Sequence, residues 1–156
     1  MTTGNDKQVR TDFIERMGLV AQAENMPRSA GRLFALLVYD GGAVAFGALA
    51  EMLQISRASV SNSVRLLEER GLVKRVTRPG ERQDFFEVAP NAFAALLAAS
   101  AARVAAARTE VAKTLGELPD EAQGPHERLT EYLGFYEAIG EGLNIAISRF
   151  GDRKKS

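Results

Sequence analysis

The feature that most constrains the fold of this chain is a pair of short helical patterns followed at once by a hairpin pattern. Helices are expected over Phe46–Leu53 and Arg57–Arg70, joined by the tight turn Gln54-Ile55-Ser56. Strands are expected over 72–77 and 83–88, with a Pro-Gly turn between them. This order predicts a winged helix-turn-helix, whose second helix enters a DNA major groove while its hairpin reaches the adjacent backbone or minor groove.

The second expected helix has two different faces. Val60, Val64 and Leu67 recur at helical spacing and are expected to face the core. Ser56 suits the N-cap and Gly71 the C′ position that ends the helix. The outward side chains are small or hydrogen-bonding and gather in the first half of the helix. These candidate DNA-binding residues are Arg57, Ala58, Ser59, Ser61, Asn62 and Arg65.

This outward face is typical of a recognition helix. Small side chains let the backbone approach the groove, Asn pairs bidentately with adenine, and Arg pairs with guanine or holds a phosphate. Serine is a poor helix former, so Ser59, Ser61 and Ser63 in one short helix are interpreted as serving a purpose other than stability. The alternative is an ordinary solvated face.

Basic charge is concentrated in the same segment. Between Ile55 and Arg82 there are seven basic and three acidic residues, a net charge of +4, whereas the 20 basic and 20 acidic residues of the whole chain cancel. A phosphate backbone would lie along such a stretch. The expected wing adds three candidate DNA contacts, Arg75, Arg78 and Arg82.

Three stretches together resemble the MarR superfamily of bacterial transcriptional regulators, and in particular its GbsR-like branch. They are MPRSAGR at 26–32, LLEERGLV at 66–73 and RPGER at 78–82, and the similarity covers about 13–91. The resemblance implies a homodimer that binds a pseudo-palindromic operator in double-stranded DNA, usually as a repressor. Many MarR wings carry Asp-x-Arg, whose Arg enters the minor groove. This chain has Glu81-Arg82 at the corresponding place in the wing, so the resemblance makes Arg82 the counterpart of that arginine.

Further helices are expected on both sides of this motif. Residues 7–25 form an amphipathic pattern with Val9, Phe13, Met17 and Val20 on one face, and Arg28–Tyr39 is the next helix. Two helices follow: an Ala-rich one over 91–118, and one over 126–150 with apolar residues along one face. The chain then ends in a short tail that is expected to fray. These terminal helices offer more apolar face than a small winged domain can cover. A dimer is therefore favoured over a compact monomer.

The expected fold class is thus mainly α with a small β-wing. It comprises an N-terminal dimerisation helix in 1–25, a winged helix-turn-helix DNA-binding domain in 26–90 and a C-terminal helical dimerisation region in 91–156.

Composition excludes several classes of site. The chain has no Cys and one His, so neither a disulfide framework nor a His/Cys metal site is expected, and no cofactor is predicted. No apolar run of the ~20 residues that span a bilayer is expected, and the N-terminus lacks the apolar stretch of a secretory signal. A cytoplasmic protein, associated with the nucleoid through DNA, is expected, with no membrane partner.

Catalytic motifs such as a nucleophile elbow or a dinucleotide fingerprint are missing from the sequence, so no enzymatic activity is expected. The GbsR-like resemblance implies a small-molecule effector, in some relatives a quaternary-ammonium osmolyte. Tyr132, Phe135 and Tyr136 are the candidates to stack on such a cation, although packing in a dimer core is the favoured interpretation. The predicted function is a sequence-specific transcriptional regulator, acting as a homodimeric repressor. The alternative is a winged-helix adaptor without DNA binding.

Overall fold

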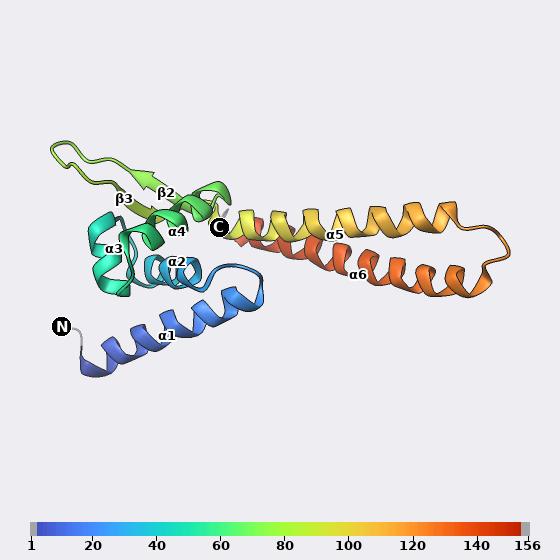
Figure 1. Ribbon diagram of the computed structural model, residues 1–156, viewed down its shortest axis with the longest axis horizontal. Coiled ribbons are helices and arrows are strands. Elements are labelled where there is room, and N and C mark those ends of the chain that lie inside the picture. Colours follow the sequence, from blue (N-terminus) through green and yellow to red (C-terminus); the bar gives the residue numbers. More distant parts are fainter. Residues whose placement is uncertain (1–2, 154–156) are drawn as a thin grey trace. The chain divides into compact units, whose positions relative to one another are not determined.

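The computed structural model describes residues 3–153 and divides the chain into two compact units after Ala92. Figure 1 shows the elements in chain order. The first unit holds α1 (Gly4–Ala23), α2 (Arg28–Asp40), β1 (Val44–Ala45), α3 (Phe46–Leu53), α4 (Arg57–Glu69), β2 (Val73–Val76) and β3 (Phe85–Val88). The second is built from α5 (Ala92–Glu117) and α6 (Gln123–Arg153).

The core of the first unit lies among α2, α3, α4 and a small sheet. Leu36 of α2, Leu49 of α3 and Leu67 of α4 are fully buried there. The strand order is β1-β3-β2 with both pairs antiparallel, and Phe86 of the central strand is also buried. A mostly helical chain with a three-stranded antiparallel sheet confirms the predicted winged-helix fold class.

Helix α1 packs on α2 through Ile14 and two small residues rather than through the apolar face predicted from the sequence. The buried positions of α1 are Ile14, Gly18 and Ala21, whereas Val9 and Val20 of the predicted apolar face are about half exposed. The helix also begins at Gly4, three residues before the predicted start. The apolar face of α1 is therefore largely uncovered within one chain.

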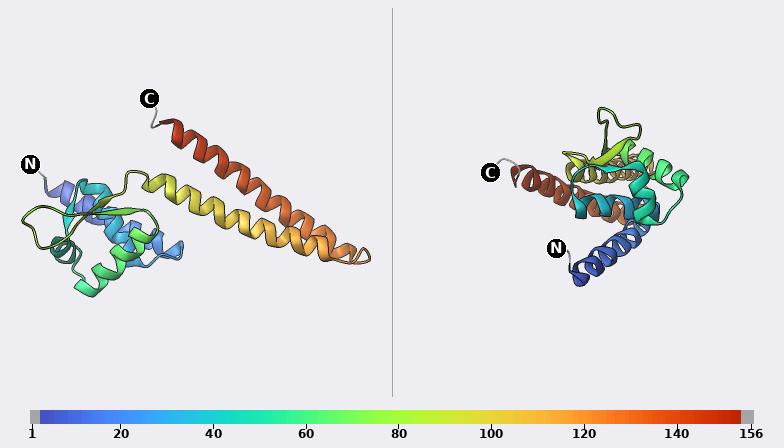
Figure 2. Two further views of the ribbon diagram at one scale, coloured as in Figure 1. Left: turned by 90° about the horizontal axis from the view of Figure 1, so that it is seen from above. Right: turned by 90° about the vertical axis from the view of Figure 1, so that its left-hand side faces the viewer.

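The second unit is a pair of antiparallel helices joined by a short loop (Figure 2). No residue of 93–153 is buried, because two helices alone cannot enclose a core. The last helix begins at Gln123 instead of His126, since Pro125 falls in the first turn, where a missing N–H costs no helical hydrogen bond. It continues to Arg153, into the tail that was expected to fray, while 154–156 lie outside the described residues.

Helix α5 corrects one expectation from the sequence. Over an 18-residue window it reaches a mean hydropathy of 1.2, so among residues 3–153 it alone is long and apolar enough to cross a membrane by length and composition. Alanine, a weakly apolar residue, supplies most of that value. One such helix is weak evidence for a membrane span, because helices of water-soluble proteins pass the same test.

Candidate nucleic-acid interface

The turn before α4 is built by local hydrogen bonds. Gln54 adopts a left-handed conformation with φ of 54°, and its side-chain amide donates to the Glu51 carbonyl at 2.7 Å. The Ser56 hydroxyl accepts from the backbone N–H of Ser59 at 3.1 Å, as the N-cap assignment predicts. After the helix, Gly71 has φ of 72°, which suits the predicted C′ glycine. The turn therefore fixes where α4 begins, and Gly71 fixes where it stops.

The interpretation of the serines in α4 was partly wrong. Ser63 is 3% exposed and its hydroxyl lies 3.2 Å from that of Ser29 on α2, so it joins two core helices. The Ser59 hydroxyl accepts from that of Ser56 within the cap at 3.2 Å. Sequence spacing already places Ser63 beside Val60 and Val64, on the buried face, and this signal could have separated it from the outward serines.

The outward face of α4 carries the remaining predicted residues. Ala58, Asn62 and Arg65 are exposed, and Ser59 and Ser61 are half-buried. Within residues 3–153, the side chains of Asn62 and Arg65 make no hydrogen bond or ion pair, so their polar groups face solvent. Arg57 is also exposed and lies over the ring of Phe46, with its guanidinium carbon 4.8 Å from the ring centre.

The wing loop, residues 77–84, is longer than the sequence predicts. Gln83 and Asp84 leave the strand ladder because both hold the start of α3. The Gln83 side-chain oxygen accepts from the Gly47 N–H at 3.1 Å, and the Asp84 carbonyl accepts from the Phe46 N–H at 2.9 Å. The base of the wing is therefore anchored to the first helix of the motif.

Two arginines lie in the wing loop. Arg78 stacks over Phe85, with its guanidinium carbon 4.2 Å from the ring centre, which restrains its direction. Arg82 is exposed and makes no hydrogen bond or ion pair with any residue of 3–153. Both guanidiniums are available to a phosphate, in contrast to that of Arg75.

Arg75 is held by carboxylates on two sides. Its guanidinium lies 3.0 Å from Glu68 of α4 and 2.7 Å from Asp84 at the wing base, and over the ring of Phe86 at 5.3 Å. The hydrogen bond to Glu68 is the main cause that raises the pKa of Arg75. Arg75 therefore joins α4 to the base of the wing. Counting charges in the sequence did not reveal this role of Arg75, because a count does not say which basic residues lie beside acidic ones.

The other basic residues of this segment are unpaired. No ion pair within residues 3–153 involves six of its seven cations: Arg57, Arg65, Arg70, Lys74, Arg78 and Arg82. Salt bridges at a surface reduce the field available to a polyanion, so these six unpaired charges leave the segment with an open positive field.

The three predicted effector residues form a ring cluster on one helix. The hydroxyls of Tyr132 and Tyr136 lie 2.8 Å apart, an interaction that raises the pKa of Tyr136, and Phe135 packs against the Tyr136 ring at 5.3 Å. The rings contact one another rather than surround an open space. Of the three, Tyr136 also lines a pocket.

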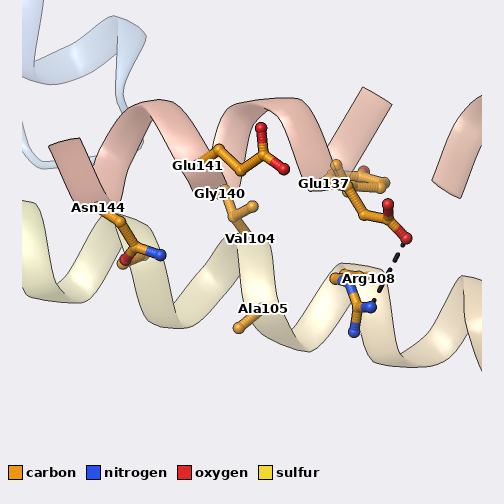
Figure 3. A pocket seen from close by; sticks show the side chains of 9 residues that line it. Val104, Ala105, Arg108, Glu137, Gly140, Glu141 and Asn144 are labelled. Carbon is orange, nitrogen blue, oxygen red and sulfur yellow. Dashed lines mark ion pairs between the residues drawn. The ribbon is translucent and has the colours of Figure 1, made fainter. Parts of the chain in front are cut away.

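That pocket, of about 340 Å³, lies between α5 and α6 (Figure 3). Arg108 and Glu137 form an ion pair across it at 3.6 Å, and Gly140 faces Val104. The lining mixes small apolar residues with carboxylates and one amide. The pocket could receive either a small ligand or a side chain of another helix.

This chain is similar in sequence and structure to known transcriptional regulators. Residues 24–84 match the MarR family. The chain is 29% identical over 147 residues to the HTH-type transcriptional regulator MmpR5 of Mycobacterium tuberculosis (strain ATCC 25618 / H37Rv), covering 91% of this chain and 87% of that protein. The crystal structure of a transcriptional regulator is 26% identical, with a TM-score of 0.71, covering 92% of this chain and 98% of that one.

Proposed function

We propose that this chain is a DNA-binding transcriptional regulator of the MarR family and that it acts as a homodimeric repressor on a pseudo-palindromic operator. The observation that carries the proposal is the outward face of α4, where Asn62 and Arg65 are exposed and without partners beside a wing that presents Arg82. A protein of this class is expected in the cytoplasm, and a regulatory rather than an enzymatic role follows from the family.

The proposed contacts divide by the chemistry of the side chains. Helix α4 enters the major groove by its first half, where Ala58 lets the backbone approach and Asn62 reads an adenine. Arg65 contacts a guanine or a phosphate. Arg78 and Arg82 extend from the wing toward the minor groove or the adjacent backbone. Arg75 takes a supporting role in place of the predicted DNA contact, because Glu68 and Asp84 hold its guanidinium.

A second copy of the chain is proposed to cover the exposed apolar faces. Val9, Met17 and Val20 on α1 are exposed, and so are Tyr132 and Ile147 on α6. Soluble proteins rarely leave continuous apolar faces of this kind open to water. A two-fold dimer would also place two recognition helices about one helical turn of DNA, ~34 Å, apart.

We further propose a place in the GbsR-like branch and a small-molecule effector. The support is the sequence at 26–32 and the aromatic cluster of Tyr132, Phe135 and Tyr136 beside the pocket. Since these rings contact one another rather than enclose a space, packing in the dimer is the stronger of the two roles.

The test is a binding titration on an operator selected from random DNA, with a scrambled duplex for comparison and a salt series. Asn62→Ala should weaken operator binding by about 1–3 kcal/mol for each bidentate base pairing it removes, with little effect on scrambled DNA. Arg82→Ala should weaken binding to both duplexes. The slope of log affinity against log salt should also fall by about one unit for each phosphate that Arg82 neutralises in the parent.

Lys113→Ala is the matched control, since Lys113 is an exposed cation on α5 in the other unit. It should bind like the parent. If both Asn62→Ala and Arg82→Ala also bind like the parent while remaining folded dimers, the DNA-reading assignment is wrong. A parent that binds no DNA would favour the adaptor function.

A further inference from the structure

Side-chain hydrogen bonds join α1 to α2 at three positions along α1. At one of these positions, the arginine involved also bonds α3 of the helix-turn-helix. Near the start of α1, Asp6 accepts from the Tyr39 hydroxyl at 2.9 Å, and Arg10 forms two bonds with Asp40 at 2.7 and 2.6 Å. In the middle of α1, Glu15 bonds two arginines of α2. These two arginines differ in what else they contact.

Arg32 is the arginine that reaches a third helix. Its Nε donates to Glu15 on α1 at 2.8 Å, and its Nη2 donates to the backbone carbonyl of Leu53 at 3.1 Å. Leu53 is the last residue of α3, and the turn that sets the start of α4 follows it directly. A cation at a helix C-terminus is also favoured by the helix dipole. One side chain therefore connects α1, α2 and the end of α3.

A glycine on α1 leaves space for the Arg32 side chain. A Cβ built on Gly18 of α1 would lie 2.6 Å from Cγ of Arg32 and 3.2 Å from Cγ of Arg28. Gly18 is buried, so the absence of a side chain there gives the stem of Arg32 its path between the helices. The Arg32 side chain is 20% exposed, which protects both of its hydrogen bonds from competition by water.

We infer that Arg32 is a positioning residue for DNA reading, which fixes the turn before the recognition helix at a set place relative to α1. The inference rests on the proposed function, in which α1 contributes to the dimer. If α1 is held in the dimer, the Glu15–Arg32–Leu53 connection sets where each α4 lies relative to the two-fold axis. The separation of the two recognition helices then depends on one guanidinium.

Arginine is needed because two acceptors must be held at once. The guanidinium presents several N–H donors in a rigid planar fork, whereas the Lys ammonium is a single point charge on a flexible stem. Arg32→Lys keeps the charge beside Glu15 but cannot hold Glu15 and the Leu53 carbonyl in the same geometry. Arg28 provides the matched control, because its side chain bonds Glu15 at 3.0 Å, makes no hydrogen bond to α3 within residues 3–153 and is 49% exposed.

The separation of the recognition helices can be measured with spin labels. The chain has no Cys, so Glu69→Cys, at the exposed end of α4, gives one label per protomer and one distance per dimer. Double electron–electron resonance should show a narrow distance distribution in this parent and in Arg28→Lys. It should show a clearly broader one in Arg32→Lys, at an unchanged dimer mass. Equal distributions in the three proteins, or equal broadening in both lysine variants, would overturn the inference.

Function should follow the same pattern. Binding is measured on the selected operator and on a version with two base pairs inserted between its half-sites, and the ratio of the two affinities is the discrimination. The parent and Arg28→Lys should have the same discrimination. Arg32→Lys should lose about tenfold of that discrimination, the size usual for residues sharing one hydrogen-bond network. Unchanged discrimination would contradict the assignment even if overall affinity fell.

Amide hydrogen exchange separates this inference from the proposed function. In the parent, the Ile55 N–H donates to the Ala50 carbonyl at 3.2 Å, and Ile55 lies two residues after Leu53, whose carbonyl Arg32 holds. Arg32→Lys should accelerate exchange at Ile55 and Arg28→Lys should not, in a dimer or a monomer. A parent without a distance signal would refute the homodimer, and exchange at Ile55 would then decide the role of Arg32. Equal exchange in the two variants would refute that role.

Discussion

The crossing of α1 and α2 makes Gly31→Ala a severe test of the packing. A Cβ on Gly31 would overlap the Cβ of Ala21 and would lie 3.2 Å from the Met17 carbonyl and 3.3 Å from the Gly18 Cα. None of these atoms belongs to a flexible side-chain end, so α1 has to move away from α2. Overpacking of this kind costs about 1–3 kcal/mol.

A helix-propensity gain opposes that loss. Alanine is better than glycine by about 1 kcal/mol inside a helix. Since the clash is between two rigid helices, its cost lies at the upper end of the range. The expected net loss in the free energy of unfolding is about 2 kcal/mol.

The assay is a urea titration read by tyrosine fluorescence. The chain has no Trp and three Tyr, of which Tyr39 belongs to the first unit. In a background with Tyr132→Phe and Tyr136→Phe, the signal reports that unit alone. With the slope of about 1–3 kcal/mol per molar usual in urea, the midpoint for Gly31→Ala should fall by roughly 1 M.

Gly4→Ala is the matched control for this experiment. It makes the same substitution in α1 at a helical position with no atom within 4 Å of the added Cβ. Its free energy of unfolding should stay within about 0.5 kcal/mol of the parent, as usual for surface changes. If Gly31→Ala is as stable as Gly4→Ala, the helices do not cross as closely as described.

Three further predictions concern the cap, the wing and the α1 ion pairs. Ser56→Ala should lower the free energy of unfolding by about 1 kcal/mol because the Ser59 N–H loses its acceptor, whereas Ser61→Ala should change it little; equal losses in urea titrations would contradict the capping role. Arg75→Gln should weaken DNA binding without changing the salt slope, since its guanidinium is held by carboxylates rather than phosphate; a slope reduced like that of Arg82→Ala would place Arg75 on the DNA. Burial acts to raise the pKa of Glu15, but hydrogen bonds from Arg32 and Arg28 prevail and lower it. The stabilisation is therefore present above the unfolded pKa of about 4.3 and is lost as pH falls through the lower folded value. Thermal melts should show Glu15→Gln less stable than the parent at pH 7 and the gap closing on acidification below about pH 4, and a gap independent of pH would refute this.

The helix-turn-helix was predicted well because its signals are local. The observed bounds of α3 are those predicted from the sequence, and Ser56 caps α4 as expected. A cap, a turn and a C′ glycine act between residues a few positions apart. The residues that decide such features are neighbours in the chain, so the amino-acid pattern carries the information.

The roles of individual polar side chains depended on tertiary contacts. Ser63 bonds Ser29, which lies 34 residues earlier, and Arg32 bonds Leu53, 21 residues later. The sequence identifies these as a small polar residue and a cation, but not what lies opposite them. The same holds for Arg75, where a candidate DNA contact proved to be paired with Glu68 and Asp84.

Sequence alone determined the order of elements, the core face of α4 and the place where basic charge gathers. Only the tertiary structure decided that α1 meets α2 through Ile14, Gly18 and Ala21, leaving Val9 and Val20 exposed. Periodicity reports which residues share a helix face, because spacing along the chain sets that directly. Which face is buried depends on how closely another backbone can approach, and at this crossing small residues allowed a closer approach than large apolar ones.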